Sequence, residues 1–398
     1  MNTLSALSHL KLSEKELLSF ILSLATEKQQ PAAIWRLPGA NLTQLIVSDR
    51  HVILDQEQFL EEIDPGFLFA PFQKSHNRFY LKADRFFTFE NGALRPHASR
   101  TEEASAQWLS EHLQNYKARK FTPPPSTTSL PADAPKELFL GIVRRGLGEI
   151  AKGTFEKIVP SRSMTVDLPE TFDLVESFQK LCTSYPEALI TLVSIPGVAT
   201  WLGASPETLV CVEDKSVFKT VALAGTQPYC PGIDLRSVAW TQKEIEEQAL
   251  VERYVISCFK RIRLREYEEH GPRTVVAGNL MHLKSEFRVD MKATNFPQIG
   301  SVMLELLHPT SAVCGMPLEP AMDFLMRNER YDRLFYAGYL GPVNVYNNIE
   351  LFVNLRCMQI IGNRGVLYAG AGVTIDSDPE KEWSETEMKL NTLLNVIL

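Results

Sequence analysis

The spacing of apolar residues predicts one helix followed by a strand-rich region in the first third of the chain. Apolar positions recur at helical spacing at Leu17, Leu18, Ile21 and Leu22, which is typical of an amphipathic helix. Residues 33–95 contain short alternating stretches such as "QLIVSDRHVIL". In "RFFTFENGALR", Asn91-Gly92 predicts a hairpin turn.

A Pro/Ser/Thr-rich stretch, "FTPPPSTTSLPADAPKEL", occupies residues 121–138 and predicts a connector. It divides the sequence into a strand-rich N-terminal part, 1–130, and a second region, 131–398, and both are expected to belong to one body. Helix is predicted from residue 137, followed by a strand in "KIVPSRSMTV". Four closely spaced strands are predicted at 189–195, 199–203, 208–213 and 216–222. Because no crossover helix fits between them, an antiparallel meander is expected.

The last part of the chain alternates between longer helices and strands. Helices are predicted at 240–267 and 319–328, and strands in "YAGYLGPVNVY", "ELFVNLRCMQII" and "GVLYAGAGVT". A closing helix should begin with Asp378 as N-cap and Pro379 at its first position. The whole pattern predicts an α+β protein with antiparallel sheet and packed helices.

Composition narrows the class of protein. The chain has 398 residues, of which 44% are apolar, and a net charge of −7. It shows no basic stripe of the kind that nucleic-acid binders carry, no apolar run of membrane-spanning length and no signal-peptide pattern. Six scattered cysteines without a C-x-x-C pair are typical of reduced, mostly buried thiols. We expect a cytoplasmic protein that acts on small molecules, without nucleic-acid or membrane partners.

The stretch "AGAGVTIDSDPEKEWSETEMKL", residues 369–390, is the first candidate for chemistry. Glu382 and Glu385 lie one helical turn apart, and Lys389 follows Glu385 at i+4. A solvated helix face with a weak ion pair explains this pattern without any function. The small residues ahead of the helix favour a ligand site, because they let a ligand approach the backbone. Carboxylates without His or Cys are the oxygen ligands that suit Mg²⁺.

Other candidates are weaker when taken singly. The acidic run "KEIEEQALVE" contains Glu247 and can be a solvated face, or one of its acids can complete a metal site with the C-terminal helix. Lys157 in "KIVPSR" and Glu207 in "SPE" are surface residues, or a base and an acid in a cleft. Arg356 interrupts an apolar strand and needs an anionic partner, either a protein carboxylate or a bound one. His308 is expected to be a buried structural histidine more than a ligand contact.

Several stretches of the second region together resemble one family. They are "KIVPSR", "LGASPETLV", "ALAGTQ", "LLHPTSAVCGMP", "YAGYLGPV", "LFVNLRC" and "YAGAGVTIDSDPEKEWSETEMKL". In this order, over residues 145–395, the chain resembles the chorismate-utilising enzymes, and among them the isochorismate synthases. The resemblance implies two stacked antiparallel sheets flanked by helices, with the active site in the cleft between them.

The resemblance also implies roles for particular residues. Lys157 is similar to the base that activates water for attack at C2 of chorismate, and Glu207 to the acid that protonates the departing C4 hydroxyl. Glu247 and Glu385 resemble ligands of Mg²⁺, with Glu382 near the ion through water. Arg356 and Lys389 are expected to anchor the substrate's carboxylates. The pocket is expected to be lined by Gly225, Gly370 and Ala312.

The expected activity is Mg²⁺-dependent conversion of chorismate to isochorismate, without an obligatory protein partner. No fused second enzyme is visible in the sequence, which favours menaquinone biosynthesis over a siderophore pathway. Salicylate synthase and anthranilate synthase stay open as alternatives, and a binding module without activity is the outside case. Two positions differ from relatives: Gln248 stands where a His is common. Ala224 stands where aminodeoxychorismate synthases carry a nucleophilic lysine, which argues against that activity.

Overall fold

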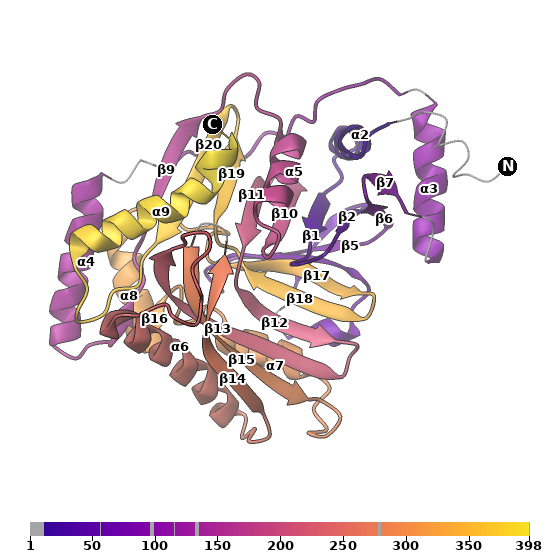
Figure 1. Ribbon diagram of the computed structural model, residues 1–398. Helices are drawn as coiled ribbons and strands as arrows, with labels where there is room; N and C mark the ends of the chain where they lie inside the picture. Colours follow the sequence, from indigo (N-terminus) through magenta and orange to yellow (C-terminus); the bar gives the residue numbers. More distant parts are fainter. Residues whose placement is uncertain are drawn as a thin grey trace.

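The computed structural model describes residues 12–55, 57–95, 99–114, 116–131, 135–277 and 280–397. Two nine-stranded antiparallel sheets stack on each other and carry helices on their outer sides, as Figure 1 shows. This is the architecture predicted from the sequence.

The first sheet has the order β7-β6-β2-β1-β10-β11-β19-β20-β9. Its strands in chain order are β1 (Ala32–Arg36), β2 (Leu42–Val47), β6 (Arg85–Glu90), β7 (Ala93–Leu94), β9 (Ser161–Asp167), β10 (Leu189–Ile195), β11 (Ala199–Ser205), β19 (Cys357–Ile361) and β20 (Arg364–Gly370). The predicted hairpin joins β6 to β7, with Asn91 and Gly92 both at positive φ, as a two-residue turn of this type requires.

The second sheet has the order β14-β15-β13-β12-β18-β17-β4-β5-β3. Its strands are β3 (His51–Leu54), β4 (Gly66–Ala70), β5 (Arg78–Lys82), β12 (Thr208–Glu213), β13 (Val217–Pro228), β14 (Glu268–Ala277), β15 (Leu280–Asp290), β17 (Tyr339–Val345) and β18 (Asn348–Val353). A separate short pair joins β8 (Lys157–Ile158) to β16 (Gly315–Met316).

Eight α-helices lie within the described ranges. They are α2 (Glu14–Glu27), α3 (Arg100–Leu113), α4 (Lys136–Ala151), α5 (Leu174–Ser184), α6 (Gln242–Arg261), α7 (Ile299–Leu307), α8 (Leu318–Asn328) and α9 (Pro379–Ile397). A short 3₁₀ turn, η1 (Leu60–Glu62), precedes β4. None of these helices is both long and apolar enough to cross a membrane.

The predicted first and last helices form with the capping expected of their sequences. Ser13 and Glu16 make a reciprocal capping box at the start of α2. At the start of α9 the Asp378 carboxylate accepts hydrogen bonds from the backbone N–H groups of Glu380 and Lys381. The helices α3, α5 and α7 were not predicted.

Both faces of the first sheet are covered, so its strands do not show a polar side. Ala33 and Trp35 of β1 point into a core between the two sheets, and Ile34 points into a second core beneath the outer helices α2, α5 and α9. On the other side, α6 packs against β13 and β15, and α7 against β12. The strand-rich N-terminal segments are part of both sheets, because β1 pairs with β10 and β4 pairs with β17.

Two predicted strand arrangements are wrong, and both errors fall where the chain passes from one sheet to the other. The four strands β10 to β13 do not form one meander, because β10 and β11 belong to the first sheet and β12 and β13 to the second. Likewise "ELFVNLRCMQII" is not one strand. It forms β18 in the second sheet and β19 in the first, with Arg356 in the connection. The hydrophobic pattern locates strands but does not say to which sheet each belongs.

The cysteines agree with the sequence prediction. All six are free, four of them are buried, Cys182 is half-buried and Cys230 is exposed.

Candidate active site

A pocket opens where the two sheets meet, and most of the predicted site residues lie around it. Its empty volume is about 530 Å³. Its lining includes seven predicted site residues, namely Glu207, Gly225, Glu247, Ala312, Arg356, Gly370 and Lys389. Lys157 and Glu385 each form an ion pair with a lining residue, Glu247 and Lys389 respectively, whereas Glu382 pairs with Lys243 outside the lining. The structure thus brings together residues that are up to 232 positions apart in sequence, from Lys157 to Lys389.

Glu207 lies in the connection between β11 of the first sheet and β12 of the second. Its carbonyl oxygen accepts a hydrogen bond of 2.9 Å from the backbone N–H of Val353, which fixes the connection against the end of β18. The side chain is 3% exposed, and within the described residues it has no ion-pair partner within 4 Å. Burial raises the pKa of Glu207 to about 7, although the more distant cations Lys157, Arg356 and Lys389 act to lower it. This carboxyl group can therefore carry a proton near neutral pH.

Arg356 occupies the corresponding connection between β18 and β19. Its backbone has φ 48°, a left-handed conformation that ends one strand before the next begins. Its guanidinium lines the pocket, and within the described residues it makes no ion pair or hydrogen bond. Burial lowers the pKa of Arg356, with Glu385 and Glu207 nearby to oppose that shift. A guanidinium without a protein partner in a pocket is suited to bind a carboxylate of a ligand.

Lys157 and Glu247 form a buried ion pair between β8 and α6. The Lys157 ammonium has no solvent exposure and lies 3.0 Å from Glu247 Oε1. Burial acts to raise the pKa of Glu247, but Lys157 and Lys243 outweigh it and hold this pKa below its ordinary value. Gly372 makes the approach possible, since a Cβ there would lie 2.1 Å from Glu247 Oε1. Glu247 is therefore a fixed anion, in contrast to Glu207.

The two acids of α9 are also buried, and each has a lysine partner. Glu382 is 1% exposed and lies 2.7 Å from the Nζ of Lys243 on α6. Glu385 lies 2.6 Å from Lys389, whose ammonium also donates to the carbonyl of Gly370 at 2.9 Å. Burial and the neighbouring Glu385 raise the pKa of Glu382 to about 7, and Lys243 opposes this.

The donor set fits a divalent cation in its chemistry. Burial acts to lower the pKa of Lys243, but Glu382, Glu247 and Glu385 all raise it, and the net shift is upward. One ammonium is thus attracted by all three acids, and it lies next to Oε1 of Glu382, whereas the buried Oε2 has no hydrogen-bond partner among the described residues. No group of three or more His, Cys, Asp or Glu side chains within the described ranges is already gathered at metal-binding distance. The three carboxylates would have to turn from their lysine partners toward a cation.

His282 on β15 is a pocket residue that the sequence reasoning missed. Its Nδ1 lies 2.8 Å from the carbonyl oxygen of Gly225, which only a protonated Nδ1 can satisfy as donor. Burial, with Arg356 second, lowers the pKa of His282 to about 3. Nε2 is then an unprotonated acceptor, buried and without a partner among the described residues. His282 offers a lone pair to a donor in the pocket, and its signal in the sequence was only a histidine within an alternating strand.

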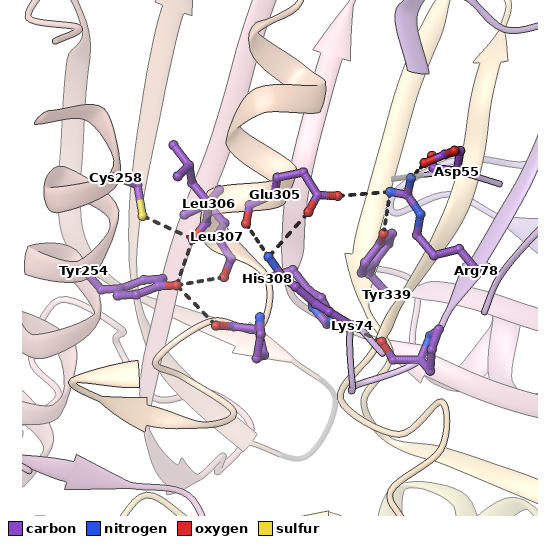
Figure 2. A network of polar contacts seen from close by, with 12 residues as sticks. Asp55, Lys74, Arg78, Tyr254, Cys258, Glu305, Leu306, Leu307, His308 and Tyr339 are labelled. Carbon is purple, nitrogen blue, oxygen red and sulfur yellow. Dashed lines mark hydrogen bonds and ion pairs between the residues drawn. The ribbon is translucent and has the colours of Figure 1, made fainter. Parts of the chain in front are cut away.

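The loop between α7 and β16 carries Ala312 and Val313 to the pocket and is held from beneath. Figure 2 shows the hydroxyl of Tyr254 on α6 directed at this turn, with the carbonyls of Leu306, Leu307 and Pro309 2.9–3.3 Å away. His308 Nε2 lies 3.1 Å from the carbonyl of Pro71, and burial lowers the pKa of His308 to about 3. His308 is therefore a buried structural histidine, as predicted, because it contacts backbone and does not line the pocket.

Among the described residues, Gln248 has no hydrogen bond to Lys157 or Lys243, the lysines next to Glu247. Its amide donates to the carbonyl of Ala222 on β13 at 3.2 Å and to the hydroxyl of Ser285 on β15 at 3.3 Å, which ties α6 to both strands. Ala224 lines the pocket and supplies no nucleophile there. Gln248 thus contributes to the packing of α6 on the sheet.

Comparison with known proteins agrees with this geometry. A family model described as "Chorismate binding enzyme" matches residues 65–398. Isochorismate synthase DhbC of Bacillus subtilis is 32% identical over 268 residues, which are 64% of this chain and 66% of that relative. Isochorismate synthase EntC of Escherichia coli K12 is 29% identical over 299 residues, 73% of this chain and 75% of that relative.

The fold is shared with a solved enzyme. The structure of MenF, the menaquinone-specific isochorismate synthase of Escherichia coli, superposes with a TM-score of 0.73 at 21% identity and covers 95% of this chain and 91% of that one. The predicted fold is confirmed by this likeness. The predicted resemblance to isochorismate synthases, and with it the prediction of an enzyme of that kind, is confirmed by the two sequence relatives. The family model matches well over half of this chain, and the chain therefore belongs to the family of chorismate binding enzymes.

Proposed function

We propose that this protein converts chorismate to isochorismate, by adding water at C2 of the ring with loss of the C4 hydroxyl. The observation that carries the proposal is Glu207, a carboxyl group in the pocket with its pKa raised to about 7. An isolated acid of this kind can donate a proton to a departing hydroxyl at neutral pH. The relatives named above support this reaction over others in the family.

The second catalytic group would be Lys157. Its amine, on β8, is the group that would take a proton from the attacking water. The Lys157 ammonium has an ion pair with Glu247 but no hydrogen bond of good geometry among the described residues. A lysine that takes a proton from water must be uncharged, so the ion pair with Glu247 has to be given up first. Separate groups for proton removal and proton donation are needed because the two events occur at different ring carbons.

Cationic side chains on the same pocket would hold the substrate. Chorismate carries two carboxylates, and the pocket presents the unpaired guanidinium of Arg356 and the ammonium of Lys389. We assign these two residues to the carboxylates, with the backbone at Gly225 and Gly370 and the methyl group of Ala312 against the ring. The uncharged imidazole of His282 can accept a hydrogen bond from a ring hydroxyl.

We further propose that Glu247 and Glu385 bind Mg²⁺, with Glu382 nearby. When bound, the ion would neutralise one substrate carboxylate and orient the ring. For this chain's own residues, binding means that Lys243 and Lys389 give up their ion pairs with Glu382 and Glu385. The product's destination stays the one predicted from the sequence, menaquinone biosynthesis.

Product identification tests the proposal. Purified protein is incubated with chorismate and Mg²⁺, with and without a chelator, and the products are separated by liquid chromatography with mass detection. We expect an isomer of equal mass that disappears when the metal is chelated. Salicylate with released pyruvate would overturn the proposal in favour of a salicylate synthase, and a product that forms only with ammonium would indicate an anthranilate synthase. Rescue of a strain without its menaquinone-specific enzyme tests the destination.

A further inference from the structure

Arg162 on β9 has an unusual number of contacts with one helix. Its Nε donates to the hydroxyl of Thr386 at 2.7 Å, its Nη2 pairs with Glu387, and its guanidinium carbon lies 3.9 Å from the centre of the Trp383 ring. All three partners are on α9, and Arg162 itself is 3% exposed. A buried guanidinium whose partners all lie on one helix fixes the position of that helix relative to its own strand.

The residues that Arg162 contacts alternate along α9 with the residues of the site. Trp383, Thr386 and Glu387 face Arg162, whereas Glu382, Glu385 and Lys389 reach toward α6 and the pocket. Residues three and four apart on a helix lie on one side, so a shift or rotation of α9 moves both sets together. The orientation of Glu382 and Glu385 therefore depends on the contacts that the other set, Trp383, Thr386 and Glu387, makes with Arg162.

The strand that carries Arg162 is also connected to the pocket. Arg162 pairs in register with Ala369 of β20, and the next residue of β20, Gly370, accepts the hydrogen bond from Lys389. A displacement of α9 away from Arg162 would change the distance between the acids of α9 and Glu247 on α6. The distance from each ligand atom to a metal ion must be right to within a few tenths of an ångström. Removal of a residue that orients a ligand typically weakens metal affinity by about 10- to 100-fold.

We propose that Arg162 is a positioning residue that holds α9 in the position at which Glu385, with Glu382 nearby, can share a divalent cation with Glu247. This rests on the proposed function, since it assigns a support to the same Mg²⁺ site. Arg162 does not line the pocket and has no ion pair with Glu382 or Glu385, so it acts through Trp383, Thr386 and Glu387.

Electrostatics gives the opposite expectation, which makes the inference testable. Removing a cation from the neighbourhood of carboxylates strengthens their attraction for Mg²⁺. If Arg162 acted only through its charge, its replacement by an uncharged residue would tighten metal binding. If Arg162 instead acts by fixing the position of α9, its replacement should weaken Mg²⁺ binding. The sign of the change therefore separates the two.

The experiment measures Mg²⁺ binding to the full chain by calorimetry, without substrate, for wild type and three variants. Arg162→Met keeps the aliphatic stem and removes the contacts, Arg162→Lys restores one donor, and Thr386→Val removes one contact without a change of charge. Arg85→Met is the matched control, because Arg85 also lies over a tryptophan, Trp108, and pairs with Asp49 at 2.7 Å, on β6 near the opposite edge of the first sheet. Circular dichroism and thermal melts confirm that each variant is folded at the assay temperature.

We expect the Mg²⁺ dissociation constant to rise about tenfold for Arg162→Met, less for Arg162→Lys and Thr386→Val, and not for Arg85→Met. Unchanged or tighter binding in a folded Arg162→Met overturns the inference. If Arg162→Met does not fold, Thr386→Val alone decides, because unchanged binding there also overturns it. Failure of wild type itself to bind Mg²⁺ would instead count against the metal site in the proposed function.

Discussion

Glu207 and Glu247 line the same pocket and are both almost hidden from solvent, but their pKa values move in opposite directions. Glu207 lies on the connection between the sheets, where its cations are all beyond ion-pair distance, and burial raises its pKa to about 7. Glu247 lies on α6 with Lys157 at 3.0 Å, and its pKa is lowered. Burial alone therefore does not set the charge of a carboxyl group, because one close cation is enough to reverse its effect.

The difference divides the pocket into two parts. The connections between the sheets present Glu207 and Arg356, neither of which has an ion-pair partner among the described residues. The helices α6 and α9 present three acids that are each paired with a lysine. An acid left alone can exchange a proton, and acids already surrounded by cations can exchange one cation for another.

Replacement of Glu207 tests the first part and has the largest expected effect. Glu207→Gln keeps the shape of the protonated acid but cannot donate its proton, so turnover of chorismate should fall about 10²- to 10⁴-fold. Thermal stability at pH 8 should not decrease, since no ion pair is lost. The matched control is Glu350→Gln, because burial also raises the pKa of Glu350 to about 7, on β18 outside the pocket lining. Turnover within tenfold of wild type for Glu207→Gln would contradict the assignment.

A double-mutant cycle on Lys157 and Glu247 tests the second part. Lys157→Met and Glu247→Gln should each lower the free energy of unfolding by about 3–5 kcal/mol, because each leaves a buried charge without its partner. The double variant should lose clearly less than the sum of the two. Urea unfolding at pH 7 measures all four proteins. Strictly additive losses would mean that the pair at 3.0 Å has no coupling and that the contrast with Glu207 is not one of partners.

Gly372 tests how closely Glu247 must approach its surroundings. Gly372→Ala places a Cβ 2.1 Å from Glu247 Oε1, so the carboxylate must move, and we expect a loss of about 1–3 kcal/mol in unfolding free energy together with weaker Mg²⁺ binding. Gly148→Ala on α4 is the control, because a Cβ there meets nothing within 4 Å. Equal stability and metal affinity of Gly372→Ala and wild type would show that the close approach is not needed.

The pH dependence has the smallest expected effect. The pKa of Glu207 is about 7 in the folded protein and about 4.5 when unfolded. The stability that its proton provides is therefore fully present below pH 4.5 and is lost as pH rises to about 7. From pH 5 to 8 wild type should lose stability relative to Glu207→Gln. The kcat/KM of wild type should fall up to about tenfold per pH unit above about pH 7. A wild-type profile that stays flat to pH 9 would sink the role of Glu207 as proton donor.

The prediction of the fold succeeded where the information was local. Helix ends at Ser13 and Asp378, and the turn at Asn91-Gly92, follow from side chains that bond to backbone within a few residues. The prediction of one continuous meander failed at Glu207, and that of one strand failed at Arg356. Nothing within a few residues of these positions distinguishes a turn within one sheet from a passage between two.

The site divides in the same way. The motifs marked Lys157, Glu207, Glu247 and Glu385 as candidates, and their roles stay predictions until they are tested. The sequence did not show that Glu247, Glu382 and Glu385 each have a lysine partner, that His282 has a free Nε2 in the pocket, or that Arg162 contacts α9. These features depend on contacts between residues tens to hundreds of positions apart.

The amino-acid sequence by itself determined many of the helices and strands, that the protein is α+β, and which residue types are available for acid, base and metal chemistry. Periodicity, capping and turn preferences act between near neighbours, so they can be found along the chain. Only the tertiary structure decided the charge state of each acid. A pKa depends on how much water is excluded and on how many ångströms away the nearest cation lies, and both are fixed when the two sheets and their helices pack together.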